Sequence, residues 1–159
     1  MTTVAYAAVT QSGLSFDRQL WMRPEIIPGL RRLTDAIHAE GAAAGIQLGH
    51  CGNMSHKSIC GCMPVGASSG FNLYSPTFVR GLRADELPEM ARAYGRSVNL
   101  AREAGFDSVE IHAGHGYLIS QFLSPSTNHR KDEFGGSLQN RMRFMDMVME
   151  EVMKAAGSD

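Results

Sequence analysis

The same order of local patterns occurs three times along the chain. Each time, a short run rich in apolar residues is followed by a polar segment and then by a longer stretch with helical spacing. The three β-like runs cover residues 3–9, 45–49 and 106–112. Strands that alternate with helices of this length form βαβ units, whose strands pair in parallel. The sequence therefore predicts an α/β fold with a parallel sheet.

Capping residues and glycines set the limits of the three expected helices, over residues 28–41, 85–105 and 137–157. Asp85 and Ser137 are expected as N-caps, since their side-chain oxygens can accept a hydrogen bond from the first turn. Each helix ends at a glycine, the residue that most readily adopts the left-handed backbone found there. Apolar residues at i, i+3, i+4 and i+7 give each helix one buried face.

Length and charge narrow the class of protein. The 159 residues carry 15 Lys and Arg against 16 Asp and Glu, a formal net charge of −1. A nucleic-acid partner would require a basic excess, and none is present. The length suits one domain. No apolar run approaches the roughly 20 residues of a membrane span, and the N-terminus has no positively charged leader pattern, so neither a membrane partner nor secretion is expected.

The chain has three cysteines, Cys51, Cys60 and Cys62, and this small, odd number does not suit a disulfide scaffold. They are typical of a reducing compartment, and a cytoplasmic protein is expected. With His50 and His56 they also raise the alternative of a metal site. Cys-x-Cys is not the usual Cys-x-x-Cys spacing, and no second pair follows, so reduced thiols without metal are expected.

Long segments follow the second and third expected strands, over residues 50–83 and 113–136. Ligands of α/β folds bind at the carboxyl ends of strands, so the chemistry is expected in these two segments. Neither a Gly-x-Gly-x-x-Gly nor a Gly-x-x-x-x-Gly-Lys-Ser/Thr pattern follows a strand. A dinucleotide-binding fold and a P-loop are therefore not supported.

The densest group of reactive side chains is His112, His115 and Tyr117. In an extended backbone His115 and Tyr117 point to the same side, and a kink at Ala113 and Gly114 would bring His112 to them. Two imidazoles can bind a carbonyl or nitro oxygen on which negative charge develops, while a phenol gives a proton to carbon. The alternatives are packed, hydrogen-bonded histidines without a catalytic role, or a zinc pair.

Gln47 lies in the middle of an apolar strand, where a buried amide needs partners. At a barrel mouth its amide can pair with a heterocycle edge that offers both a donor and an acceptor. The alternative is a glutamine that bonds only to neighbouring backbone. The segment 128–144 contains Arg130, Asp132 and Arg141 and is expected to hold a long loop in place through charge-assisted hydrogen bonds.

Three blocks, taken in order, resemble the old yellow enzyme family of NAD(P)H:flavin oxidoreductases. Gly-Ile-Gln-Leu-Gly-His-x-Gly at residues 45–52 resembles the third barrel strand of the family. Residues 104–124 resemble its fourth strand and active-site loop, and residues 128–144 resemble the segment before its fourth helix. A weaker likeness extends over nearly the whole chain.

This resemblance implies part of an FMN-dependent (β/α)8 TIM barrel, with about three βα units corresponding to strands 2 to 4. It implies that Gln47 binds the flavin pyrimidine edge and that His112 and His115 bind the oxygen of an activated alkene. It implies that Tyr117 donates the proton, with NADH or NADPH as reductant. Some members of the family act on dienoyl thioesters instead.

Residues 1–159 are accordingly expected to form a partial barrel domain that lacks the first strand and strands 5 to 8. Open sheet edges and an uncovered inner face are expected to make it self-associating, as a homo-oligomer or with a complementary barrel half. An inactive half-barrel that works only through such association is an alternative function. A metal-binding protein that uses the histidines and cysteines is a second alternative.

Overall fold

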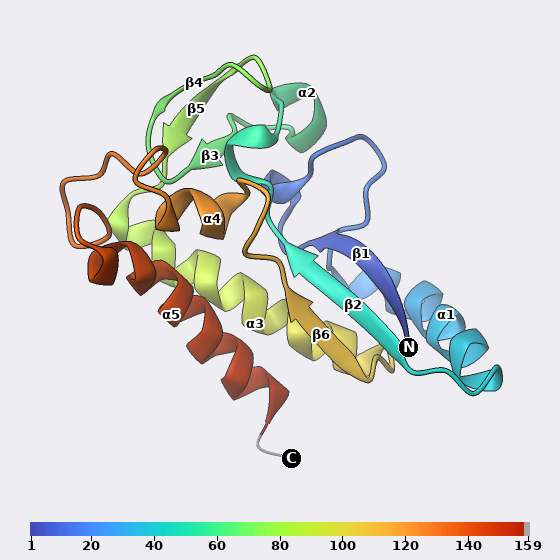
Figure 1. Cartoon of the computed structure of the whole chain (residues 1–159). Coiled ribbons are helices and arrows are strands. Elements are labelled where there is room, and N and C mark those ends of the chain that lie inside the picture. Colours follow the sequence, from blue (N-terminus) through green and yellow to red (C-terminus); the bar gives the residue numbers. More distant parts are fainter. Residues whose placement is uncertain (158–159) are drawn as a thin grey trace.

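Three parallel strands form the main sheet of this computed structural model, which describes residues 1–157. Strands β1 (Thr2–Ala8), β2 (Ala44–Gly49) and β6 (Ser108–Ile111) lie in the order β1–β2–β6 (Figure 1). The parallel pairing and all three predicted strands are confirmed, with ends shifted by one or two residues. The sheet is therefore built from one strand of each predicted βα unit.

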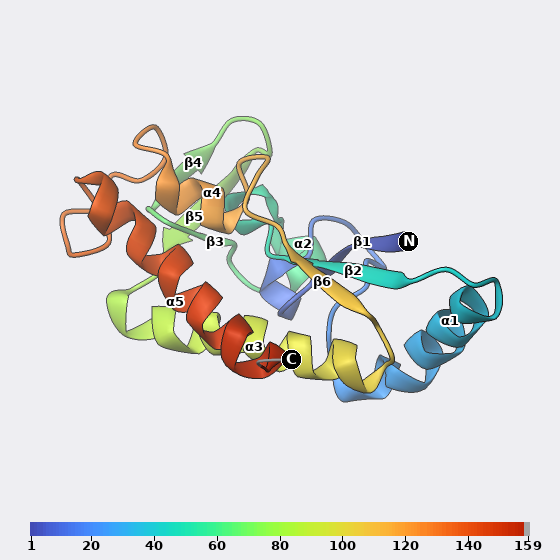
Figure 2. The ribbon, with the colours of Figure 1, turned by 60° about the horizontal axis from the view of Figure 1, so that its bottom comes forward.

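The three long helices, α1 (Ile27–Ala39), α3 (Leu87–Glu103) and α5 (Leu138–Ala156), lie on one face of this sheet (Figure 2). Side chains of a strand alternate between faces, so every second residue of β2 points into the core. Ala44, Ile46 and Leu48 are accordingly fully buried beneath these helices. Within residues 1–157, no helix covers the opposite face, which carries Gln47.

Strand β1 contains a β-bulge. Its register against β2 shifts between Val4, which pairs with Ile46, and Ala7, which pairs with Leu48. One more residue therefore lies in β1 than in the facing stretch of β2. The end of β1 is covered by the segment around Trp21, which forms a parallel bridge with Ala8.

The segment after β2 is more ordered than the long loop expected over residues 50–83. It forms a small second sheet in which β5 (Thr77–Gly81) pairs in parallel with β3 (Val65–Gly66) and antiparallel with β4 (Gly70–Asn72) (Figure 1). These strands are too short to give a periodic apolar pattern. The same segment contains the short helices η3 (Gly52–Met54) and α2 (Lys57–Cys60).

Of the two expected N-caps, one is confirmed and one is wrong. The Ser137 Oγ accepts a hydrogen bond from the Asn140 N–H at 3.2 Å, as expected for the cap of α5. Asp85 lies inside a short 3-10 helix, η4 (Ala84–Glu86), and is paired with Arg83. The backbone N–H of Arg83 donates instead to the carboxylate of Glu86 at 2.7 Å, because the Glu86 side chain can reach back across the turn.

Three further short helices were not predicted: η1 (Gln11–Gly13), η2 (Pro24–Ile26) and α4 (Leu118–Leu123). No helix within residues 1–157 is long and apolar enough to cross a bilayer.

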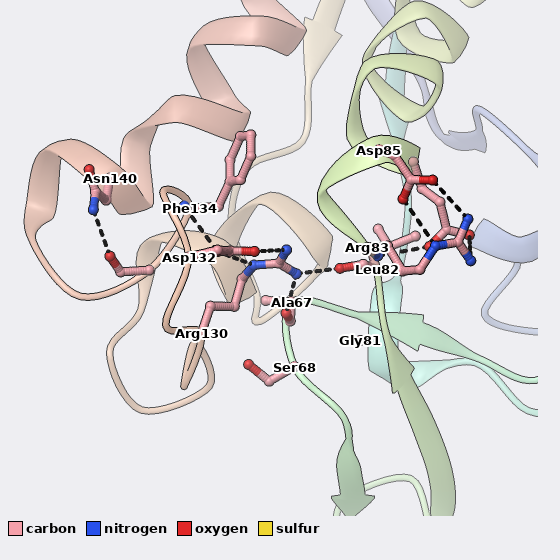
Figure 3. A network of polar contacts seen from close by, with 12 residues as sticks. Ala67, Ser68, Gly81, Leu82, Arg83, Asp85, Arg130, Asp132, Phe134 and Asn140 are labelled. Atoms are coloured by element: carbon pink, nitrogen blue, oxygen red, sulfur yellow. Dashed lines mark hydrogen bonds and ion pairs between the residues drawn. The ribbon is translucent and has the colours of Figure 1, made fainter.

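The loop between α4 and α5 is held by Arg130, as the sequence predicts for this segment (Figure 3). The Arg130 guanidinium pairs with Asp132, with Nε 2.9 Å from Oδ1, and donates to the carbonyl oxygens of Ala67 and Leu82. Its side chain is only 8% exposed. Arg130 thereby ties the loop before α5 to the small sheet.

Candidate functional site

The rings of His112, His115 and Tyr117 meet at the carboxyl end of β6. The backbone N–H of His112 donates to the Leu48 carbonyl at 2.9 Å. This bond continues the pairing of β6 with β2 and fixes the direction in which the His112 side chain leaves the strand. The ring centroids of His115 and Tyr117 each lie 4.9 Å from that of His112. The predicted triad is therefore brought together.

The backbone reaches this arrangement by a different route from the expected one. Residues after β6 do not stay extended, because the Tyr117 N–H bonds to the Gly114 carbonyl at 3.1 Å and closes a tight turn. His115 and Gly116 occupy the left-handed region, with φ of 56° and 69°. A non-glycine residue rarely adopts this conformation, and it is found where surrounding contacts hold it. The turn reverses the chain so that the His115 ring contacts the His112 ring.

Nε2 of His112 and Nδ1 of His115 are 3.1 Å apart and share a hydrogen bond. One of these nitrogens must therefore carry a hydrogen while the other accepts it. Burial of His112 holds the pKa of its imidazole below the usual value, and the neighbouring His115 lowers it further. The pair thus favours a neutral His112, which retains one N–H donor.

Tyr6 is a fourth member of this cluster that the sequence patterns did not reveal. Its ring centroid is 5.3 Å from that of Tyr117 and 6.0 Å from that of His112, and its hydroxyl donates to the Gly13 carbonyl at 2.9 Å. Burial raises the pKa of Tyr6 far above its ordinary range, so it stays a phenol. Tyr6 walls the cluster on the β1 side.

Gln47 lies on the sheet face that no helix covers in the part of the chain that the structure describes. Its Nε2 donates to Oε1 of Glu110, the residue directly opposite on β6, at 2.7 Å. Within residues 1–157, its carboxamide oxygen has no hydrogen-bond partner. The alternative of a glutamine bonded only to backbone is therefore not observed.

Gln121 joins the two loops that carry the site, and no sequence pattern pointed to it. The side chain is 1% exposed. Its Nε2 lies 2.7 Å from the Gly116 carbonyl and 2.9 Å from Oδ1 of Asn53, and its Oε1 accepts from the Asn53 N–H at 3.2 Å. The turn that carries His115 is thereby fixed to the segment that follows β2.

His50 is locked as a neutral structural residue. Its Nδ1 accepts from the Gly52 N–H at 2.9 Å, so the hydrogen must be on Nε2, which lies 3.1 Å from the Ser12 hydroxyl. Complete burial lowers the pKa of His50 to about 3. Within the described residues, no three His, Cys, Asp or Glu side chains are grouped to hold a metal ion.

A groove of about 420 Å³ adjoins the turn that contains Gly116. It runs between the β4–β5 hairpin, which contributes Phe71 and Tyr74, and the loop with Thr127 and His129. The groove shares Gly116 with the turn of the candidate site, and its lining does not include Gln47, His112, His115 or Tyr117.

Comparison with known proteins identifies the chain's relatives. The sequence profile of the NADH:flavin oxidoreductase / NADH oxidase family matches residues 1–159. The chain belongs to this family. It is 41% identical, over 99% of its length, to a 4,4'-dithiodibutanoate disulfide reductase from Rhodococcus erythropolis, and 39% identical, over 94% of its length, to an NADPH dehydrogenase from Bacillus subtilis. It covers 39% and 44% of those two proteins.

Solved structures of old yellow enzyme relatives are also similar to this chain over nearly its whole length. An old yellow enzyme homologue from Zymomonas mobilis superposes with a TM-score of 0.92 at 33% identity, over 98% of this chain and 46% of that one. Morphinone reductase in complex with tetrahydroNAD superposes with a TM-score of 0.91 at 29% identity, over 98% of this chain and 48% of that one. The parallel sheet and its helices are therefore part of an α/β barrel, and the chain spans less than half of these relatives.

Membership of the NADH:flavin oxidoreductase family implies a flavin and a nicotinamide as cofactors. The predicted family is thus confirmed, while the roles of Gln47, His112, His115 and Tyr117 stay predictions.

Proposed function

We propose that this chain is the part of an FMN-dependent NAD(P)H oxidoreductase that binds and protonates an activated alkene, such as an enone or a dienoyl thioester. In this proposal His112 and His115 bind the electron-withdrawing oxygen of the alkene, and Tyr117 donates the proton. Gln47 binds the flavin. The observation that carries the proposal is the convergence of the three rings at the end of β6, with both 4.9 Å centroid distances centred on His112.

The face around Gln47 fits a planar heterocycle. Its free carboxamide oxygen can accept a hydrogen bond from a pyrimidine N–H, while its amide can donate to a pyrimidine carbonyl. The flanking residues on this face, Gly45 and Gly49, add no side chain. A Cβ on Gly49 would lie 3.0 Å from the Tyr6 ring and 3.2 Å from Cβ of His112. Hydride transfer from NADH or NADPH to the alkene β-carbon is the chemistry that bound FMN would supply.

The histidines would act through N–H donors rather than through a positive charge. Because burial and His115 both favour the neutral form of His112, the pair would stabilise charge that develops on the alkene oxygen by hydrogen bonding. An oxygen bound by both rings would replace their mutual hydrogen bond of 3.1 Å.

Tyr117 is placed to move a proton. Its ring stands edge-on to His112, at an interplanar angle of 87°, and within residues 1–157 its hydroxyl has no hydrogen-bond partner. The hydroxyl can therefore donate to the alkene α-carbon without losing a bond in the protein. Its half-buried position lets water return the proton to the phenolate.

The first test is a titration of the purified chain with FMN, followed by desalting and measurement of flavin absorbance and fluorescence. Retained, quenched flavin is expected, and Gln47→Leu should lower the retained fraction. With flavin bound, Tyr117→Phe should slow alkene reduction while flavin reduction by NADPH stays nearly intact. Tyr94→Phe is the matched control, because the Tyr94 hydroxyl is buried in the core and has no hydrogen-bond partner within the described residues. Equal loss of both half-reactions in Tyr117→Phe would exclude the proton-donor role.

A second candidate function is association with another chain, as a homo-oligomer or with a complementary barrel half. Within the described residues, β1 and β6 are the outer strands of the sheet, and each presents unpaired backbone groups along one edge. A folded sample that retains no flavin alone, but retains it when it assembles, would favour this function.

A further inference from the structure

We propose that Cys60 and Cys62 form a thiol–disulfide exchange site, in which a low-molecular-weight disulfide oxidises the two thiols to a reversible Cys60–Cys62 disulfide. The site lies on the segment between β2 and β3, and its chemistry does not require the flavin proposed above. Cys62 is the attacking thiol and Cys60 the resolving thiol.

The two sulfur atoms are already in contact. Sγ of Cys62 lies 3.7 Å from Sγ of Cys60, and Sγ of Cys60 also lies 3.2 Å from the Cys62 carbonyl oxygen. A disulfide needs the sulfurs to approach to about 2.05 Å, with Cα atoms up to about 6.8 Å apart. Residues two apart in a chain reach at most about 7 Å, so rotation of the side chains is enough to close most of this gap.

Gly61 makes the backbone between the cysteines adaptable. Cys60 is the last residue of α2, and Gly61 is its C-cap with φ of 75°. The Gly61 N–H donates to the Lys57 carbonyl at 2.9 Å, which holds the turn in the absence of any crosslink. The conformation is one that glycine adopts without steric cost. The thiols are thus held together before any bond forms.

Exposure assigns different roles to the two sulfurs. Cys60 is 3% exposed, whereas Cys62 is exposed and lines a groove of about 550 Å³ together with Met63, Arg80 and Arg83. A small disulfide can therefore reach Cys62 but not Cys60. Partial burial and the contact with Cys60 raise the pKa of the Cys62 thiol, and Arg80 opposes this rise. Exchange is consequently expected to be faster at mildly alkaline pH.

The reaction conserves electrons and protons. The Cys62 thiolate attacks one sulfur of the small disulfide, forms a mixed disulfide and releases one small thiol. The Cys60 thiolate then attacks Sγ of Cys62 and releases the second small thiol. Two protein thiols are oxidised, one small disulfide is reduced to two thiols, and the protons lost by the cysteines are taken up by the departing thiolates.

The third cysteine is excluded from this chemistry. Cys51 is fully buried, its Sγ donates to the Leu14 carbonyl at 3.2 Å, and burial raises its pKa to about 12. A crosslink between residues two apart closes a small ring and adds little stability, and the exposed Cys62 sulfur makes it accessible to reduction. The pair is therefore expected to respond to the thiol–disulfide balance around it.

The experiment treats the reduced chain with oxidised glutathione at mildly alkaline pH, blocks free thiols with N-ethylmaleimide, and digests with trypsin. Lys57 and Arg80 bound a tryptic peptide over residues 58–80 that contains Cys60 and Cys62 but not Cys51. This peptide is expected unalkylated and lighter by two hydrogen atoms, and the peptide with Cys51 is expected free of any disulfide. Reduced glutathione should reverse the change.

Three serine variants test the order of events. Cys60→Ser is expected to accumulate a glutathione adduct on Cys62, because the resolving thiol is missing. Cys62→Ser should react far more slowly than wild type, and Cys51→Ser should behave as wild type. The proposal is overturned if wild type keeps glutathione on Cys62 without forming the internal disulfide, if Cys51 enters the crosslink, or if Cys62→Ser reacts at the wild-type rate.

Discussion

Nδ1 of His115 lies 3.1 Å from Nε2 of His112, in a turn whose left-handed backbone at His115 directs the two rings at each other. Two imidazoles at this distance disfavour a second positive charge, because protonation removes the acceptor and adds like-charge repulsion. The pair is therefore built to hold neutral His112 beside Tyr117.

This arrangement predicts the titration of His112. Its NMR-monitored pKa should lie below about 6.5, the value of an unperturbed histidine. His115→Gln should raise that pKa, but not to the unperturbed value, because burial is the larger cause and remains. An unchanged pKa in His115→Gln would mean that the second imidazole does not act on the first.

His50 should dominate the loss of stability in mild acid. Its folded-state pKa of about 3 is lower than the unfolded value of about 6.5, so the unfolded chain binds the proton first and stability falls with falling pH. The fully developed loss is on the order of 5 kcal/mol, reached only as the pH approaches 3. Glu86 and Asp132 also stabilise the folded chain, because hydrogen bonds from arginines lower the pKa of their carboxyl groups. That stabilisation is lost only as the carboxylates become protonated, at a lower pH than the one at which the loss from His50 begins.

Urea unfolding between about pH 6.5 and 5 checks this prediction. His50→Asn should flatten the decline of the unfolding free energy with pH, whatever its effect on stability at neutral pH. His129→Asn, at an exposed position, is the matched control and should keep the wild-type slope. An identical slope in both variants would contradict the assignment.

Alanine substitutions at Gly52 and Gly41 distinguish the cost of a steric clash from the cost of backbone strain. Both have a positive φ, 63° and 72°, but a Cβ on Gly52 would lie 2.4 Å from Nε2 of Gln121, whereas a Cβ on Gly41 meets no atom within 4 Å. Gly41→Ala should cost about 1 kcal/mol, and Gly52→Ala at least about 2 kcal/mol more, because Gln121 must give up its bonds. Chemical denaturation measures both, and equal losses would show that Gln121 moves freely.

Arg130 should not tolerate lysine. A lysine keeps the charge but not the planar set of donors that joins Asp132 to the Ala67 and Leu82 carbonyls. Arg130→Lys should lower the unfolding free energy by about 2 kcal/mol, since buried acceptors lose their partners. Arg92→Lys, whose ion pair with Glu89 is exposed, should change it by less than about 0.5 kcal/mol. Similar losses would mean that Arg130 acts only as a surface charge.

Tyr94 carries a buried hydroxyl that has no hydrogen-bond partner within the described residues. Tyr94→Phe should therefore be neutral or stabilising by up to about 1 kcal/mol, because it removes a desolvated group that bonds to nothing. Thr34→Val is the contrasting variant. The Thr34 hydroxyl donates to the Ala104 carbonyl at 2.6 Å, and its removal should cost about 1–2 kcal/mol. Thermal unfolding compares the two, and a clear loss in Tyr94→Phe would reveal an unseen partner.

The main sheet, its three helices and the meeting of His112, His115 and Tyr117 could be predicted because each depends on local patterns. The apolar spacing of each helix and the glycine at its end can be recognised within one continuous stretch of sequence. The two histidines are likewise only three residues apart. The roles proposed for these side chains follow from the chemistry of imidazole and phenol groups, and the resemblance of residues 104–124 to a known active-site loop implies the same roles.

The remainder depends on contacts between distant residues. The small sheet forms from strands of two to five residues that have no periodicity of their own. Gln121 is one glutamine among several until the loop after β2 folds against it. The left-handed backbone at His115 follows from the contacts around the turn, since nothing in the residue type requires it. Such features are visible only once the chain is folded.

The register shift in β1 has a consequence for the phase of the whole strand. Counting from Thr3, which faces Gly45, strict alternation would send Tyr6 toward the helices and Ala5 toward Gln47. The extra residue between Val4 and Ala7 inverts this parity, so that the Tyr6 ring stands over the imidazole of His112 while Ala7 still enters the core. The bulge thus accommodates one extra residue without turning Tyr6 into the core, and deleting Ala5 would restore regular pairing with Tyr6 opposite Gln47, on the same face as the histidines.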